Sequence, residues 1–182
     1  MRLFRLLRFV VVMSALSATV VAQPQVTATE ADVEVWVAAI KQIRREQSKD
    51  LALVNETVPA AEFYRLSDVT RERVLIDKLL LRNNSSFLIS SNVTSSIELV
   101  DAKSVRKSGR GEFDTNVISA RFGQRNQRLV RLSLPVFSDD GARALVYTWA
   151  AGGFDDFRGG GYLFERKQGE WIIVDYLARW IT

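Results

Sequence analysis

Neighbouring aspartates are the residues of this sequence best suited to acid–base or metal chemistry. Asp139 and Asp140 precede a glycine, and Asp155 and Asp156 lie in a glycine-rich stretch that also holds Arg158. A calcium loop needs further oxygen ligands at fixed spacing, and this pattern does not supply them. Aspartate is common in turns because its side chain accepts hydrogen bonds from nearby backbone N–H groups, so Asp139 and Asp140 are interpreted as turn residues. For Asp155 and Asp156 the favoured interpretation is a solvated surface position. Binding of a cation and pairing with Arg158 remain alternatives.

Two further motifs admit both a functional and a structural interpretation. Gly159–Gly161 has the composition of a phosphate-binding loop, but neither a helix nor a Lys-Ser or Lys-Thr pair follows it, so the match is weak. Four arginines recur at spacings of three and four, which on a helix forms a basic stripe: Arg121, Arg125, Arg128 and Arg131. The alternation in Leu129–Val136 indicates a strand instead. These arginines are therefore expected on a solvated face.

The sequence contains no histidine and no cysteine. This excludes Ser–His and Cys–His nucleophiles, disulfides, and thiolate or imidazole metal ligands. A hydrolase that uses a pair of carboxylates stays an alternative, with Glu165 and Asp175 as the least implausible pair. Their structural interpretation is a salt bridge to Arg131 or Arg179. We assign no catalytic, cofactor-binding or metal-binding residue.

A loop predicted at Gly152–Gly160 exposes two phenylalanines among charged residues. Aromatic rings are costly to leave in water unless they fold back or meet a partner. The favoured interpretation is a cap over the end of the sheet, and the functional interpretation is the rim of a binding cleft. This possible binding rim consists of Phe154, Asp155, Asp156, Phe157 and Arg158.

Residues 1–22 have the layout of a secretory signal peptide. Three arginines in the first eight residues precede the uncharged stretch of residues 9–22, which ends in Val-Val-Ala. That stretch is shorter than the roughly 20 residues of a spanning helix, although an uncleaved anchor stays an alternative. We expect cleavage before Gln23, a secreted or periplasmic chain, and no stable membrane insertion after cleavage.

The net charge of +4 belongs largely to this first segment. Without its three arginines the chain has 22 basic and 21 acidic residues, a balance of +1. A nearly neutral remainder without a basic cluster argues against nucleic-acid binding.

The first half of the remaining chain predicts two helices and one strand. The first helix is expected over Thr27–Lys49, where Thr29 and Asp32 resemble a capping box. Its apolar stripe should face the core and consists of Val33, Trp36, Val37, Ile40 and Ile43. A strand is predicted at Leu51–Val58 and a second helix at Asp68–Leu81.

The last third predicts four strands joined by short turns: Arg128–Phe137, Ala142–Ala151, Gly161–Lys167 and Trp171–Ile181. Strands with short connections pair antiparallel, and Trp171 is expected to anchor the core. The weak periodicity of Asn92–Gln127 predicts no element. Residues 23–182 should therefore form one α+β domain, in which the amino-terminal helix packs on a curved antiparallel sheet that ends in a four-stranded meander.

A pattern of glycine and aromatic residues runs through Leu132–Thr182. It reads S-x-x-x-F-x-x-x-G-x-x-A-x-V-Y, then G-x-G-Y and G-x-W-x-I, and is carried by Ser133, Phe137, Gly141, Ala144, Val146, Tyr147, Gly159, Gly161, Tyr162, Gly169, Trp171, Ile173 and Trp180. This pattern resembles a family of secreted bacterial proteins of uncharacterised function. The resemblance implies a cystatin-like or nuclear-transport-factor-2-like α+β fold and no catalytic residues. Many relatives carry a cysteine pair in the glycine-rich loop, which this chain lacks.

These observations favour an exported non-enzymatic module that binds a small molecule or a protein partner. The ligand or envelope partner is not identified by any motif. The alternatives are a structural or oligomerising envelope protein and, with less support, a hydrolase that depends on Asp and Glu.

Overall fold

The computed structural model describes residues 28–47, 49–89, 97–107, 113–123, 127–152 and 156–181. They form an α+β fold in which helices cover a mixed sheet of seven strands. The predicted signal peptide lies outside the described residues. Within the described part, no helix combines the length and the apolar character that crossing a membrane requires.

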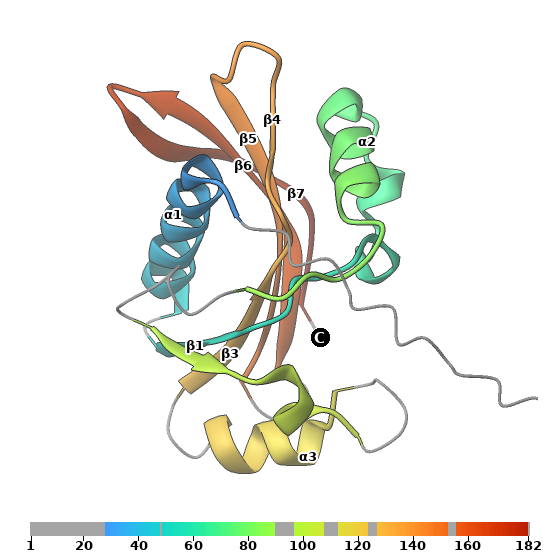
Figure 1. Ribbon diagram of the computed structural model, residues 1–182, viewed down its shortest axis with the longest axis vertical. Helices are drawn as coiled ribbons and strands as arrows, with labels where there is room; N and C mark the ends of the chain where they lie inside the picture. The colour runs from blue at the N-terminus through green and yellow to red at the C-terminus, as the bar shows by residue number, and fades with distance from the viewer. Residues whose placement is uncertain are drawn as a thin grey trace, which may run out of the picture.

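The sheet has the strand order β2-β1-β3-β5-β6-β7, with the short β4 also paired to β5. Figure 1 shows that the sheet is strongly curved and that its long strands run through the middle of the molecule. The strands are β1 (Asp50–Val54), β2 (Glu98–Val100), β3 (Gln127–Leu132), β4 (Val136–Phe137), β5 (Arg143–Ala151), β6 (Phe157–Lys167) and β7 (Glu170–Ile181).

The α+β class and the antiparallel carboxyl-terminal strands are confirmed, whereas one edge of the sheet is parallel. β3, β5, β6 and β7 pair antiparallel in sequence order. β1 pairs parallel with both β2 and β3, because long connections join these strands and leave their direction free. The strand predicted at Arg128–Phe137 is interrupted at Ser133–Pro135, where proline has no N–H for the ladder.

Helices lie on both faces of the sheet (Figure 1). α1 (Glu30–Gln47) covers one face and α2 (Arg73–Arg82) the other. The capping box of α1 is confirmed, since the Thr29 N–H donates to Asp32 (2.9 Å) and the Asp32 N–H donates to Thr29 Oγ1 (3.2 Å). The buried stripe is shifted from the predicted one, with Val35 and Ala39 inside while Val33 and Val37 remain at the flank.

The segment for which the sequence predicted no element contains short turns of helix. Two of them are α3 (Thr115–Ile118) and the π-helical turn η5 (Ser119–Gly123). The side chain of Asp114 caps α3 by accepting from two backbone N–H groups. The third turn in this segment is the 3₁₀ segment η4 (Ala102–Val105). Two further 3₁₀ segments, η1 (Ala60–Glu62) and η2 (Leu66–Asp68), lie earlier in the chain, between β1 and α2.

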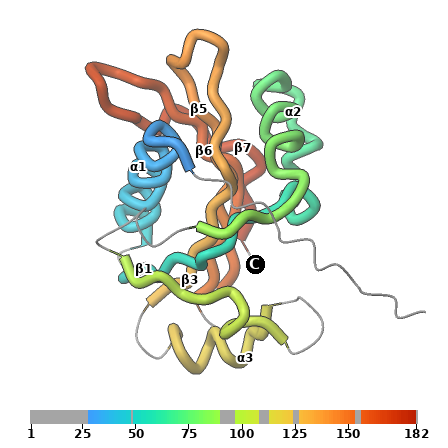
Figure 2. Tube along the Cα trace, in the orientation of Figure 1, coloured from blue at the N-terminus to red at the C-terminus, as the bar shows by residue number. Residues whose placement is uncertain are grey.

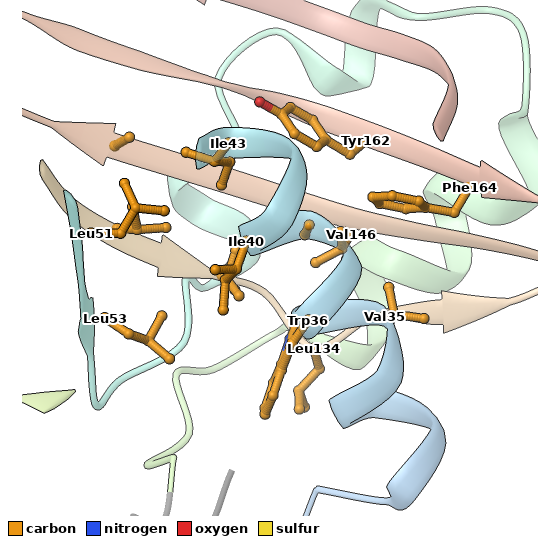
Figure 3. Packing of buried hydrophobic residues seen from close by; sticks show 14 of the residues in the cluster. Val35, Trp36, Ile40, Ile43, Leu51, Leu53, Leu134, Val146, Tyr162 and Phe164 are labelled. Atoms are coloured by element: carbon orange, nitrogen blue, oxygen red, sulfur yellow. The ribbon is translucent and has the colours of Figure 1, made fainter. Parts of the chain in front are cut away.

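Three hydrophobic clusters fill the two faces of the sheet. The largest lies under α1, where the side chains of the helix meet those of β1, β3, β5 and β6 (Figure 3). A second cluster lies under α2, and a third lies beside α3 at the end of the sheet. Trp36 anchors the first cluster, because it is 1% exposed and its indole N–H donates to the Ser133 carbonyl (2.8 Å). Trp171, predicted as a core anchor, is only half-buried at the flank of that cluster.

Glycines shape the last three strands. Gly141 and Gly169 sit in the two hairpin turns with φ values of 68° and 85°, a region that favours glycine. β6 already begins at Phe157, so the predicted loop is shorter than Gly152–Gly160. At Gly159, a Cβ atom would lie 2.7 Å from the Trp180 ring and 2.8 Å from the Thr148 carbonyl oxygen. The glycine run therefore serves close packing inside the sheet.

Candidate ligand-binding groove

The described residues of the predicted rim lie at the end of the sheet. Asp156 accepts a short hydrogen bond from Arg128 and also pairs with Arg158 (3.3 Å) and Lys49 (3.8 Å). The ring of Phe157 is half-buried, packs against the cluster beside α3 and lies 5.9 Å from the Trp149 ring. These contacts are those expected of a cap. Phe154 and Asp155 lie outside the described residues.

The charges around Asp156 set its protonation. Burial raises the pKa of the Asp156 carboxyl, but the hydrogen bond and charge of Arg128, followed by the charge of Arg158, outweigh burial and hold the pKa below its usual range. The carboxylate is therefore ionised and compensated by its three cations. In this arrangement it serves as the centre of an ion-pair cluster.

Arg158 also lines a small cavity of about 10 Å³, next to Glu46, Thr148 and Tyr162. This volume holds about one water molecule. The buried Oε1 of Gln47, another lining residue, has no hydrogen-bond partner among the described residues. The cavity is suited to a bridging water and is too small for a larger ligand.

The predicted carboxylate pair does not form a partnerless site. Glu165 pairs with Lys167 (2.9 Å), and Asp175 pairs with Arg71 (3.2 Å). The predicted partners Arg131 and Arg179 are thus replaced by other cations. Among the described residues no group of three or more Asp and Glu side chains is arranged to hold a metal ion.

The aspartates of the predicted turn and two of the four arginines have structural contacts. Asp140 accepts from Ser138 Oγ (2.5 Å) and from the Ala142 N–H (3.0 Å), which confirms its turn role. The prediction that the arginine series is solvated is wrong for Arg128 and Arg131, which are 2% and 0% exposed on β3. β3 is buried on both faces, so alternation along its sequence did not mark an outer face.

The described residues form a groove of about 660 Å³ between α1 and the β6–β7 hairpin. Figure 2 shows the tip of this hairpin extending beside the amino-terminal end of α1. Apolar side chains from both elements line the groove: Val33, Val37 and Ala38 from α1, and Phe164, Trp171 and Ile173 from the hairpin. We call this feature the α1–hairpin groove.

A polar bridge fixes the hairpin against the helix at one end of the groove. Glu34 accepts from the Trp171 indole N–H (3.3 Å) and from Arg166 (3.3 Å), whose guanidinium lies 5.6 Å from the Trp171 ring centre. These contacts hold the hairpin wall in place. They leave the apolar part of the Trp171 ring as one side of the groove.

A second polar cluster lies beyond the other end of the groove and is centred on Glu46. The Glu46 carboxylate accepts from Tyr176 (2.5 Å) and Tyr162 (3.2 Å), while Gln42 donates to the Tyr176 oxygen (3.0 Å) and Arg179 lies 3.7 Å from Glu46. Burial, together with Glu46, raises the pKa of both phenols. The two tyrosines are therefore protonated donors that tie β6 and β7 to α1.

The groove was missed at the sequence level although part of its signal is visible there. Val33 and Val37 were assigned to the buried stripe, but the helix turns its Val35 and Ala39 face inward. The sequence signal for the groove was that α1 has more apolar residues than one buried stripe needs. The opposite wall depends on how the β6–β7 hairpin curls beside the helix, which is a property of the tertiary structure.

Comparisons of the chain with family models, with curated protein sequences and with solved structures gave no match. The resemblance based on the glycine and aromatic pattern therefore stays a prediction.

Proposed function

We propose that this protein is an exported, non-enzymatic module that binds a small, largely apolar molecule in the α1–hairpin groove. The observation that carries this proposal is the groove itself. Its volume of about 660 Å³ lies within the range of small-molecule sites, and apolar side chains line both walls. Such sites combine an apolar lining with a few polar groups that fix orientation, which is the composition found here.

The state of the ionisable groups supports a binding role over catalysis. Asp156, Glu165 and Asp175, the carboxylates considered for chemistry, each have a cationic partner. A general acid or base needs a site where its proton can be exchanged with a substrate. The carboxylates that line the groove are Glu30, Glu34 and Glu170, and Glu34 is paired with Arg166. They lie away from its apolar part, which includes Phe164 and Ile173.

The proposal is tested with an environment-sensitive apolar dye and a variant that fills the groove. Ala38→Trp places a large ring between the two walls and should abolish the dye signal without unfolding the protein. The matched control is Leu81→Trp, a substitution at a side chain that is 77% exposed on α2. Equal dye binding by both variants, with native circular dichroism spectra, would contradict the proposal.

A second candidate function is that of an oligomerising envelope protein. Among the described strands, β7 lies at the edge of the sheet beside β6, and it exposes Ile172 (44%) and Val174 (42%). An apolar edge strand is a template for pairing with a second copy of the chain. Sedimentation velocity of wild type and of Ile172→Lys/Val174→Lys tests this; a wild-type monomer at high concentration rules it out.

Export to the periplasm or the medium is part of the proposal and rests on the first 22 residues. The expected mature chain starts at Gln23. Intact-mass measurement of the exported protein checks this start. A soluble species that retains Met1 would contradict it.

A further inference from the structure

Two cations face the α1–hairpin groove without an ionic partner among the described residues. Lys41 and Arg45 lie one turn apart on the flank of α1 that lines the groove, and both are exposed. Neither forms an ion pair with any residue that the structure describes. By contrast, Arg166 and Arg179 beside the groove pair with Glu34 and Glu46. The free positive charge of the groove is thus concentrated at Lys41 and Arg45.

The opposite end of the groove is acidic. Glu30 and Glu34 come from the first turns of α1, and Glu170 comes from the hairpin turn. With a rise of 1.5 Å per residue, Glu30 and Lys41 are roughly 16 Å apart along the helix axis. Apolar side chains, among them Val37, lie between the two ends. The groove therefore has an apolar middle, a basic end and an acidic end.

We propose that the α1–hairpin groove binds an anionic amphiphile, with its head group at Lys41 and Arg45 and its apolar chain along Val37 and Ile173. This inference rests on the proposed binding function and specifies the ligand. The basic end attracts a carboxylate, sulfate or phosphate head, and the glutamates at the far end disfavour the reversed orientation. A cationic amphiphile would be repelled by Lys41 and Arg45 if its head group lay at the basic end. With its head group at the acidic end, its apolar chain would lie beside these two charges.

Arg45 also has an ordinary structural role, because basic residues in the last turn compensate the helix macrodipole. Arg44 performs the same role and is also exposed, but it does not line the groove. Arg44 is therefore a matched control for charge changes that affect helix stability alone.

The experiment displaces the groove-bound dye with three single-chain amphiphiles of equal length below their micelle concentrations: dodecanoate, dodecanol and dodecyltrimethylammonium. We expect dodecanoate to displace the dye at the lowest concentration from wild type. Lys41→Glu/Arg45→Glu should weaken dodecanoate about tenfold and leave dodecanol unchanged, while Arg44→Glu should change dodecanoate less than twofold. Added salt should weaken dodecanoate only, because exposed charges are screened.

The outcomes separate the inference from the function on which it rests. If dodecanoate and dodecanol bind wild type equally and the double charge reversal has no effect, the head-group inference is wrong and the apolar groove stands. If Arg44→Glu weakens dodecanoate binding as much as the double variant does, the effect comes from the net charge of the protein, and the head-group inference is wrong. If none of the three displaces the dye and Ala38→Trp still binds it, both the inference and the groove proposal fail.

Discussion

Arg131 carries a positive charge into the interior of the protein. Its side chain is fully buried, donates to Glu62 and to the Thr57 carbonyl (3.0 Å), and lies 4.6 Å from the Phe113 ring centre. Burial lowers the pKa of Arg131, and the nearby charge of Glu62 opposes this effect. Arg131 pairs with Glu62 and lies 3.7 Å from the more buried Glu56, which also pairs with Arg106.

Replacing Arg131 should destabilise the fold strongly. Arg131→Met removes the ion pair with Glu62 and the hydrogen bond to the buried Thr57 carbonyl, while Glu56 keeps Arg106 as a partner. Leaving buried polar groups without their partners costs about 1–3 kcal/mol. Arg44→Met, at an exposed position, should change the free energy of unfolding by less than about 0.5 kcal/mol. Urea unfolding measures both variants; a loss below about 1 kcal/mol for Arg131→Met would show that the cluster does not hold this region together.

Asp156 should make the stability of the protein depend on pH. Its folded-state pKa is lowered below the ordinary value of 3.8, so its contribution is complete above pH 3.8 and is lost as the pH falls through the folded-state pKa. The difference in unfolding free energy between wild type and Asp156→Asn should be constant from pH 7 to 5 and shrink below about pH 4. Urea unfolding across this range measures it.

The control for this pH series is Asp139→Asn, because the Asp139 side chain is 93% exposed. Its effect on stability should be small at every pH. An Asp156→Asn difference that stays the same from pH 7 to 3 would contradict the role assigned to its ion pairs.

At the scale of elements, an ion pair joins the two main helices although they cover opposite faces of the sheet. Arg82 at the end of α2 binds the fully buried Asp32 at the start of α1 through two hydrogen bonds of 2.9 Å each. Arg82 also donates to the Pro135 carbonyl, in the gap between β3 and β4. The Arg82 side chain therefore connects the two helices beside the point where the strand is interrupted.

Loss of this connection should cost more than loss of the helix cap. Arg82→Met leaves Asp32 buried and unpaired and should cost about 3 kcal/mol or more, whereas Thr29→Ala should cost about 1 kcal/mol. Thermal and urea unfolding measure both. Adding Asp32→Asn to Arg82→Met should recover part of the loss; strictly additive effects would mean that the two side chains are not coupled.

At the scale of the whole molecule, the two faces of one sheet share their strands, so the hydrophobic clusters depend on one another. β5 contributes Ala144 and Val146 to the α1 face and Leu145 and Tyr147 to the α2 face. A change in the largest cluster is therefore expected to lower the stability of the whole described fold in one transition.

The two tryptophans of the α1 side should differ in their contributions. Trp36→Ala removes a buried ring and a hydrogen bond and should cost about 3–5 kcal/mol. Trp171→Ala removes a half-buried ring at the hairpin flank and should cost about half as much or less. Urea unfolding followed by far-ultraviolet circular dichroism compares them; equal losses would contradict the assignment of Trp36 as the anchor.

The sequence by itself determined the local features of this fold. Thr29 and Asp32 specified the start of α1, and the turns at Gly141 and Gly169 specified the antiparallel order of the last strands. These features depend on contacts between residues that are close in the chain, so composition and spacing encode them directly. The lack of cysteine and histidine likewise limited the available chemistry from the start.

The tertiary structure alone decided the parallel pairing of β1, the burial of Arg131 and the α1–hairpin groove. Each depends on residues far apart in the sequence: Asp50 opposite Gln127, Arg131 beside Glu62, and Trp171 beside Glu34. A strand buried on both faces has no polar side to reveal its partners, and a groove exists only once two separate elements pack. Distance in space, which sequence spacing does not encode, therefore determined where the groove lies.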